Sequence, residues 1–509
     1  VAMGGLALDA NTTADGNTAV GYDSLSTNTG SELNVAIGFN ALRLYNNSSG
    51  SGYNTAVGAL AGAAVTTGTA QVLIGALAGD AITDGNYNIA VGVAALSSDT
   101  SGSRTVAIGH AALTAQNFTS STDNYNVAVG YQAGTAVTTG IQNTLIGGLA
   151  GDALTDADFN VAVGTAALSQ DTLGSRATAL GFGALSVQNF TSATDSYNTA
   201  VGYHAGIGVT TGIQNTLIGG LAGDALTTSG RNVALGYAAL SAETLGQYST
   251  AIGYFALGSQ SNTSNLATYN TAVGYGAGSV INTGIQNTLI GGLAGDAITT
   301  ADSNTAVGYS SLSTNTTGNY NVAVGSVALL GNTTGSSNTA VGLSALEVNT
   351  TASNGTAMGF RALKLNTTGA NNTAVGFESL TSNTTGALNV AVGSYALDAN
   401  TTASNSTAVG YQALTANTTG ATNTAFGKGA LLANTTGNTN VAVGANALAA
   451  NVDGDKSVAV GVDALAAQDP ASNVDMYNVA VGDSAGKAVT TGVQNTLIGG
   501  LAGDAITTG

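Results

Sequence analysis

The side chains that most often carry out chemistry in proteins are scarce in this sequence. The only histidines are His110 and His204, and there is no cysteine among the 509 residues. A zinc site needs three or four clustered ligands, and an activated nucleophile needs an adjacent base. Two isolated histidines can supply neither. The sequence therefore predicts no catalytic residue, no metal site and no cofactor, and we expect both histidines at the surface.

One carboxylate does recur at a fixed place, in the tripeptide Gly-Asp-Ala. Its copies are Asp80, Asp152, Asp224, Asp296 and Asp504. Regularly spaced copies lie four repeats apart, about 19 Å at one strand spacing per repeat, which is too far for two of them to share a calcium ion. The Asp-rich nonapeptide of calcium-binding β-rolls is absent. We therefore expect a solvated turn at each copy.

The composition excludes several classes of protein. Charged residues make up 7% of the chain, glycine fills 73 positions, and 44% of the residues are hydrophobic. Disordered chains are poor in apolar residues, so this composition predicts an ordered, repetitive protein. Only 9 Lys and Arg stand against 27 Asp and Glu, so no basic patch can neutralise a nucleic acid. No run of 18 apolar residues appears, so we expect no membrane insertion.

Any functional side chain would be positioned by an internal repeat. Its consensus is Asn-Thr-Ala-Val-Gly-Tyr-x-Ala-Leu-x-x-Asn-Thr-Thr-Gly-x-x. We call the glycine after the apolar pair the anchor glycine. Of the 28 spacings between the 29 anchors, 23 are 17 residues, one is 20 and four are 21. The structural anchors on which we rely most are Gly21, Gly130, Gly202, Gly274 and Gly410.

A unit of 17 residues is too short for a pair of helices. It suits one turn of a β-solenoid, with two short strands joined by two turns. The sequence therefore predicts an all-β, parallel β-solenoid: a single continuous shaft of 29 turns over residues 1–509. Both ends fall inside a repeat, and solenoids need polar caps, so we also expect a segment of a longer protein.

The predicted strand is apolar on both faces. The residue before the anchor is apolar in all 29 repeats, as at Val201 and Ile218, and the one before that is usually Ala. Successive strand residues point to opposite faces, so such a strand needs two cores. The interior of the turn supplies one core. A neighbouring chain most simply supplies the other, so the pattern predicts self-association.

Two further patterns concern packing. Asn stands four residues before the anchor in 21 of the 28 repeats where that position is visible. Stacked Asn side chains can form ladders, and Asn also suits turns; both interpretations stay open. Within residues 58–291 a longer register of about 72 residues appears, in which Gly replaces the usual Leu, as at Gly206. The next repeat has Leu in place of Ala, as at Leu217, which predicts volume compensation between layers.

Four insertions are the best candidates for contacts with other molecules. Each adds four residues at the same corner of its repeat: Gln116–Tyr125, Gln188–Tyr197, Gln260–Tyr269 and Gln468–Tyr477. Insertions in solenoids map to one face, often the binding face. A loop that decorates the shaft, or packs on the next chain, is the simpler interpretation. The candidate residues are the aromatics Phe118 and Phe190, expected to be exposed, and the polar residues Asp123, Asp195, Asn262 and Asp475.

The recurring Asn-Thr-Thr fits the acceptor pattern for N-linked glycans, as at Asn332, Asn366, Asn417 and Asn434. Turn preference explains the same tripeptide without any sugar, so both interpretations stay open.

The motif at Asn198–Tyr203 and Asn304–Tyr309 resembles the head repeats of trimeric autotransporter adhesins. The longer version, at Gly410–Gly420, is similar to repeat arrays in phage tail-fibre and related virion proteins. The resemblance covers essentially the whole chain. It implies a left-handed parallel β-roll, three chains around one axis, and a role in attachment.

We therefore expect a structural, non-enzymatic fibre, a homotrimer at the virion surface or otherwise extracellular. The first hypothesis is a phage tail or side fibre that holds a receptor-binding tip and mediates attachment to a host-cell surface receptor or glycan. The second is the shaft of a bacterial surface trimeric adhesin. The third is a monomeric solenoid that binds ice or polysaccharide through threonine rows such as Thr18, Thr55 and Thr199.

Overall fold

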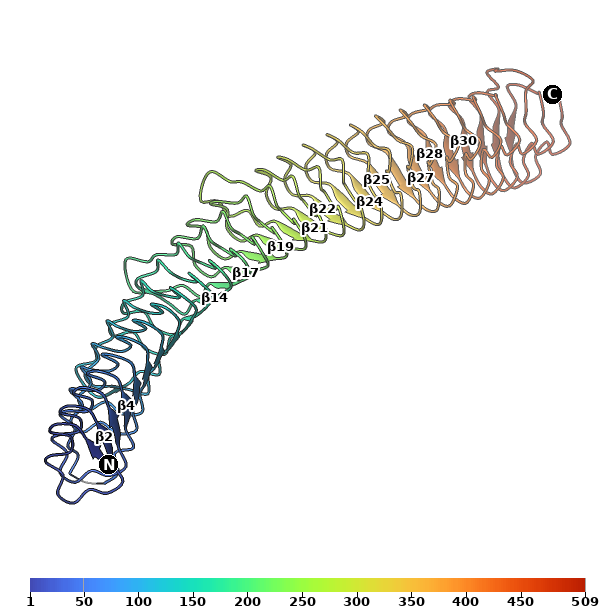
Figure 1. The fold of residues 1–509 in the computed structure, drawn as a ribbon. Coiled ribbons are helices and arrows are strands. Elements are labelled where there is room, and N and C mark those ends of the chain that lie inside the picture. The colour runs from blue at the N-terminus through green and yellow to red at the C-terminus, as the bar shows by residue number, and fades with distance from the viewer. Residues whose placement is uncertain (49, 509) are drawn as a thin grey trace. The chain divides into compact units, whose positions relative to one another are not determined.

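The chain folds as an all-β, parallel β-solenoid of about 29 turns of about 17 residues, which confirms the predicted fold class. The structure is a computed structural model and describes residues 1–48 and 50–508. Figure 1 shows the turns as successive loops, each with one short strand. The turns form two compact units. The first holds Val1–Tyr254 with Ser261–Ala267, and the second holds Phe255–Gln260 and the chain from Thr268 onward.

The first unit has one main strand per turn. These strands are β1 (Ala2–Met3), β2 (Thr18–Val20), β3 (Val35–Ile37), β4 (Thr55–Val57), β5 (Val72–Ile74), β6 (Ile89–Val91), β8 (Val106–Ile108), β10 (Val127–Val129), β11 (Thr144–Ile146), β12 (Val161–Val163), β14 (Thr178–Leu180), β16 (Thr199–Val201), β17 (Thr216–Ile218), β18 (Val233–Leu235) and β19 (Thr250–Ile252).

The second unit follows the same plan. Its strands are β20 (Thr271–Val273), β21 (Thr288–Ile290), β22 (Thr305–Val307), β23 (Val322–Val324), β24 (Thr339–Val341), β25 (Thr356–Met358), β26 (Thr373–Val375), β27 (Val390–Val392), β28 (Thr407–Val409), β29 (Thr424–Phe426), β30 (Val441–Val443), β31 (Val458–Val460), β32 (Val479–Val481) and β33 (Thr496–Ile498).

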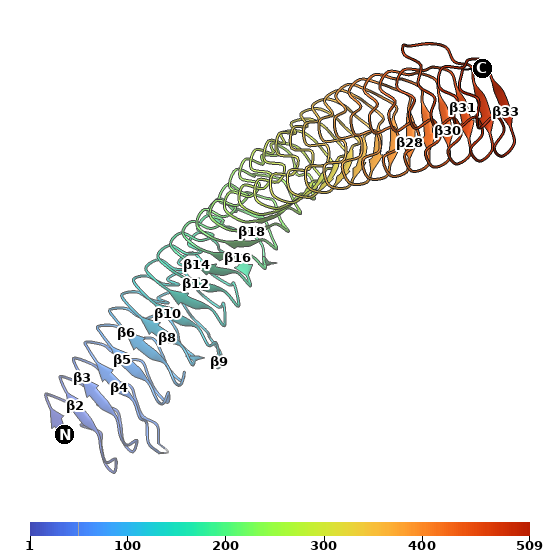
Figure 2. The same ribbon diagram turned by 90° about the vertical axis from the view of Figure 1, so that its right-hand side faces the viewer.

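Within each unit the main strands of successive turns pair in parallel, as the rows of arrows in Figure 2 show. The register places each repeat position on its own counterpart: Ala200 of β16 pairs with Leu217 of β17, and Val201 pairs with Ile218. Parallel strands lie about 4.8 Å apart. Every side chain therefore meets the side chain of the same repeat position one turn away.

The prediction of two strands per turn is wrong, because in the described residues only one strand is present in every turn, and a second short strand occurs only beside some of the inserted loops. The reason lies in the backbone after the anchor. In the turn of Gly202, both His204 and Gly206 have left-handed φ angles, of 53° and 59°. A pleated strand cannot include such residues. This side of the turn still bonds to the next one, as in the 2.9 Å hydrogen bond from the Gly206 N–H to the Ala222 carbonyl.

The anchor glycines are required by close stacking. Gly202 has a φ of 138°, which disfavours any residue with a Cβ. A Cβ built there would also lie 2.5 Å from the carbonyl oxygen of Gly219, the anchor of the next turn. The other chosen anchors share this backbone, with φ values of 135° to 146° at Gly21, Gly130, Gly274 and Gly410. Replacement of any of them would push two turns apart.

The interior of the solenoid is lined by the middle residue of each strand. Ala200 of β16 is fully buried, and so is Ala205 of the same turn. The first and third strand residues point outward and are at most half-buried within the single chain. The predicted inner core is thus confirmed. The second apolar face lies on the outside, and no part of the described chain encloses it.

The volume compensation is confirmed. A Cβ at Gly206 would lie 2.6 Å from Cδ1 of Leu217, and a Cβ at Gly223 would lie 2.7 Å from its Cδ2. Leu217 therefore fills the space left by two glycines in successive turns. The arrangement recurs with Leu73, Leu145, Leu289 and Leu497.

The ladder interpretation of the asparagines is also confirmed. Asn321 is fully buried; its backbone N–H donates to Oδ1 of Asn304 at 2.9 Å, and its Nδ2 donates to the Gly335 carbonyl. A second ladder runs through the Asn of Asn-Thr-Thr, where Nδ2 of Asn332 donates to Oδ1 of Asn315 at 2.8 Å. Buried amides that are bonded in this way avoid the penalty of an unsatisfied polar group.

A double-mutant cycle tests the Gly206–Leu217 contact. Leu217→Ala should destabilise its turns by about 2–5 kcal/mol through the cavity it leaves. Gly206→Ala should destabilise them through the clash and through its left-handed φ. Combining the two should cost at least about 0.5 kcal/mol less than the sum, because the cavity accepts the new methyl group. Hydrogen exchange of the amides in β16–β18 measures each effect locally; strict additivity would contradict the proposed compensation.

Candidate functional site

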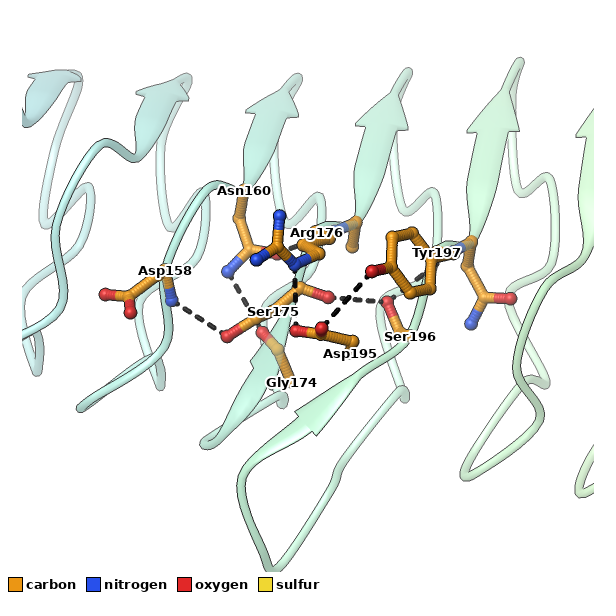
Figure 3. Close-up of polar contacts among 10 residues, drawn as sticks. Asp158, Asn160, Gly174, Ser175, Arg176, Asp195, Ser196 and Tyr197 are labelled. Atoms are coloured by element: carbon orange, nitrogen blue, oxygen red, sulfur yellow. Dashed lines mark hydrogen bonds and ion pairs between the residues drawn. The ribbon is translucent and has the colours of Figure 1, made fainter.

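The four inserted loops project from the same repeat position, and two of them are built alike. In Figure 3 the loop at Gln188–Tyr197 extends beyond the neighbouring turns. Its returning arm forms β15 (Thr194–Asp195), which pairs in parallel with β13 (Gly174–Ser175) of the preceding turn. The loop at Gln116–Tyr125 repeats this pairing with β9 (Thr122–Asp123) and β7 (Gly102–Ser103).

A buried carboxylate of the preceding turn holds the start of each of these two loops. Asp171 is fully buried and accepts hydrogen bonds from the Gln188 side-chain amide at 2.6 Å and from the Phe190 backbone N–H at 3.1 Å. Burial raises the pKa of Asp171, and these donors offset part of that shift. The other loop repeats the arrangement with Asp99, Gln116 and Phe118.

The prediction that Phe118 and Phe190 are exposed is wrong. Their side chains are only 7% and 5% exposed. The backbone N–H of each phenylalanine donates to the buried carboxylate, so this contact draws the ring inward with the backbone. These aromatics fix the loops to the solenoid and cannot be the groups that meet a partner.

A cation of the preceding turn holds the other end of the loop. Nε of Arg176 lies 3.0 Å from Oδ1 of Asp195, and the guanidinium lies 4.8 Å from the ring centroid of Phe159 and 5.8 Å from that of Tyr197. Figure 3 shows Arg176 above Asp195, with the Tyr197 hydroxyl directed at the same carboxylate. Exposed ion pairs and cation–π contacts contribute only about 1 kcal/mol or less each. These contacts of Arg176 therefore orient the loop more than they stabilise the fold. The equivalent residues of the other loop are Arg104, Asp123, Tyr87 and Tyr125.

The remaining two loops use variants of these contacts. Asn262 is buried, and within the first unit its backbone N–H and side-chain amide donate to Glu243 at 3.1 and 2.7 Å. Asp475 pairs with Lys456 at 2.7 Å, and the ammonium group lies over the ring of Tyr477. All six candidate residues of the loops are therefore used in intrachain contacts or buried beneath the loop.

Beyond these contact residues, several of which stay about half exposed, the loops expose their tips. These carry small polar residues and lack charge: Thr119–Ser121, Thr191–Ala193, Thr263–Asn265 and Ala471–Asn473. The tips can offer hydroxyl and amide groups to a partner. They bring together no acid, base or nucleophile.

The histidines do not form a site. His110 stacks on Tyr131 at 5.5 Å between ring centroids, and His204 stacks on Tyr203 at 3.9 Å. His110 is exposed and His204 is half-buried, which agrees with the expected positions at the surface or at an edge of the solenoid. In residues 1–48 and 50–508 no three His or carboxylate side chains are grouped so that they could hold a metal ion, and no pocket opens.

The expectation of a fully solvated turn at Gly-Asp-Ala is wrong for one oxygen of each carboxylate. Oδ1 of Asp224 is buried without a hydrogen-bond partner, and burial raises the pKa of the group. The same holds for Asp80, Asp152 and Asp296. Their separation along the chain still prevents a shared ion.

The asparagines of the Asn-Thr-Thr acceptor pattern are inaccessible in the folded chain. Asn332, Asn366, Asn417 and Asn434 are all buried to within 1%. Each Nδ2, the atom that would carry a glycan, donates two hydrogen bonds, as Asn434 does to Asn417 and to Gly437. The folded solenoid therefore cannot accept an N-linked glycan at these positions.

The largest unusual surface is the outward face of the main strands. We call the first and third residues of these strands the outer stripe, which includes Val201 and Ile218. An aromatic row, the residues directly after the anchors, flanks the stripe. Its rings stack between adjacent turns, as Tyr237 and Tyr254 do at 5.7 Å. This surface can bury apolar area, but it contains no reactive group.

Sequence reasoning missed the groups that fasten the loops. Asp171 and Asp99 stand seven residues after their anchors, where other repeats have the ladder Asn, and always one repeat before an insertion. Arg176 and Arg104 stand five residues before the next anchor. An acidic residue at a repeat position that otherwise carries apolar or amide residues was the signal that could have revealed them.

Substitution of Asp171 tests the buried fastening. Asp171→Ala leaves N–H donors unsatisfied, at a cost of about 1–3 kcal/mol, so exchange of the Phe190 amide should speed up roughly ten- to hundredfold. Asp171→Asn should keep the loop fastened, because Asn451 occupies the equivalent place before the fourth loop and accepts the Gln468 amide at 3.0 Å. Equal loosening in both variants would contradict the proposed role.

The same variants predict a pH dependence. Because burial raises the folded-state pKa of Asp171 above its unfolded value, ionisation of this group opposes folding at neutral pH. That cost disappears as the pH falls through the folded pKa towards the unfolded value. Protection of the Phe190 amide, corrected for intrinsic exchange, should therefore rise on acidification, and the rise should be smaller in Asp171→Asn. A loop that loosens in mild acid would contradict this sign.

Comparison with known proteins finds no family model that matches the chain and no characterised protein with a significant sequence match. No helix among the described residues is long and apolar enough to cross a membrane. The resemblance of the repeat to fibre and adhesin arrays therefore rests on its own residues, and the biological role must be argued from the surfaces of the solenoid.

Proposed function

We propose that this chain is the structural, non-enzymatic shaft of an extracellular or virion-surface fibre, in which copies associate side by side as a homotrimer. The shaft holds a receptor-binding tip away from its base, as in a phage tail or side fibre that attaches to a host-cell receptor or glycan. The shaft of a bacterial trimeric adhesin is the alternative. The side-by-side association is the physical part of the proposal, and the outer stripe carries it.

The outer stripe is free of charge along its whole length. In all 29 repeats the two outward strand positions carry only Thr, Val, Ile, Leu, Met or Phe, although the chain has 27 Asp and Glu. The centres of protein–protein interfaces are depleted of charge in the same way. A solvated strand face would instead alternate with polar and charged residues.

The aromatic row exposes several large side chains. In the first unit seven side chains of the aromatic row are each more than half exposed: Tyr22, Phe39, Tyr131, Phe182, Tyr203, Tyr237 and Tyr254. At about 100 Å² each they expose on the order of 700 Å² before the stripe is counted. Exposed aromatic rings of this kind can supply apolar area to an interface, which at standard size buries about 800 Å² per partner.

The ice- or polysaccharide-binding alternative loses support from the same surface. Thr18, Thr55 and Thr199 lie on the outer stripe, but Val35 and Val72 interrupt their column. A flat binding face needs an unbroken rank of hydroxyls, which this column does not supply.

Light scattering of the isolated chain tests the association. The expected mass is three times the 49.2 kDa of one chain. Val201→Asp should dissociate or weaken the assembly, because a buried unpaired charge costs several kcal/mol, while Asp195→Ala should change the mass little.

A charge-matched control separates the stripe from general repulsion. Thr211 is exposed on a turn outside the stripe, so Thr211→Asp adds the same charge and should leave the assembly intact. A natural chain that stays at 49.2 kDa, or equal effects of Val201→Asp and Thr211→Asp, would overturn the side-by-side association.

A further inference from the structure

Four glycines of the aromatic row have no reason within the chain to be glycine. Gly148, Gly220, Gly292 and Gly500 each follow an anchor directly, in four of the five turns whose interior holds the compensating Leu; the turn of Leu73 has Ala76 there. None of them has a left-handed φ. The backbone would therefore accept any ordinary residue at these four places.

Packing within the chain does not require them either. A Cβ at Gly148 or Gly500 would meet nothing within 4 Å. At Gly220 and Gly292 the nearest atoms would be ring carbons of the following tyrosine, at 3.4 and 3.7 Å, which is ordinary contact. Beside Gly148, the anchor Gly147 would place a Cβ 2.6 Å from backbone atoms of the next turn. The contrast within one dipeptide shows which glycine the fold needs.

Three of these glycines, Gly148, Gly220 and Gly292, open a gap one turn after a projecting ring, whereas Gly500 follows Asp483. Tyr131 precedes Gly148 by one turn and is 56% exposed, and Tyr203 precedes Gly220 and is 57% exposed. A projecting ring is therefore followed by a gap one turn later at each of these places. In the first unit the pair recurs after 72 residues, four turns or about 19 Å at one strand spacing per turn.

We propose that these gaps receive aromatic side chains of the same row from a second copy of this chain, and that this contact fixes the axial register of the copies. The inference rests on the side-by-side association proposed above and goes beyond it. Glycine loses more backbone freedom on folding than any other residue, so a glycine without a local cause is explained by a close approach from outside.

A second copy suits the gaps better than another partner. Ring and gap lie on one surface, so two copies present complementary features to each other, as self-association requires. Only Lys428 and Asp483 bring a charged side chain into this row, which leaves little to recognise an ionic ligand. The row also flanks the outer stripe, which carries no charged residue.

The experiment fills two gaps without disturbing the turn. In the double variant Gly148→Leu and Gly220→Leu, circular dichroism and hydrogen exchange of β11–β18 should match the natural chain. The assembly should dissociate at least tenfold more readily in sedimentation. Alanine at both positions should have a smaller effect in the same direction, and Thr211→Leu, which adds the same side chain outside the row, should have none.

The outcomes separate this inference from the proposed function. If the natural chain assembles and the double leucine variant assembles equally well, the gaps do not set the register, although the association stands. If the natural chain stays monomeric, the association fails and this inference fails with it. Loss of native exchange protection in the leucine variant would overturn the claim that the chain itself tolerates a side chain there.

Discussion

Backbone pairing between successive turns forces every repeat position to lie on its own counterpart about one strand spacing away. The residue at each repeat position must therefore be able to pack against the residue at the same position in the next turn. Glycine stacks where two backbones nearly touch, as at Gly202 and Gly219. Asparagine stacks where an amide can donate along the axis, as from Asn332 to Asn315. A large residue is admitted only where its neighbours shrink, as Leu217 is between Gly206 and Gly223.

This constraint explains which features could be predicted from sequence. We call the residues at one repeat position in successive turns a column. The repeat length, the anchors, the buried Ala column and the Gly–Leu exchange are all properties of such columns, and a column can be recognised in a single sequence. The second strand was predicted wrongly because backbone conformation is not visible in a column of ordinary residues. His204 and the residues two after other anchors have φ angles near 55° without being glycine.

The loops were located correctly but their side chains were misjudged for the same reason. An insertion leaves the column, so its contacts are set by whichever turn it falls against. Phe190 is buried because Asp171 of the preceding turn binds its N–H, and Asp195 is paired because Arg176 stands one turn away. Each contact joins residues at two different repeat positions. Alignment of the repeats compares residues only at the same position, so it does not reveal such contacts.

The side chains inside the solenoid thus pack and hydrogen-bond with one another, whereas the outer stripe has no packing partner within the described chain. Interior amides are bonded along the axis, and interior volumes are matched between turns, so nothing in the core calls for a partner. The outward strand positions are different: they carry threonine or large apolar residues, bear no charge and stay partly exposed, while the acidic residues lie outside the outer stripe. Negative charge at the corners opposes random association, whereas its absence from the outer stripe leaves one face available. In the proposed fibre the copies associate through this stripe, which runs from turn to turn across the strands.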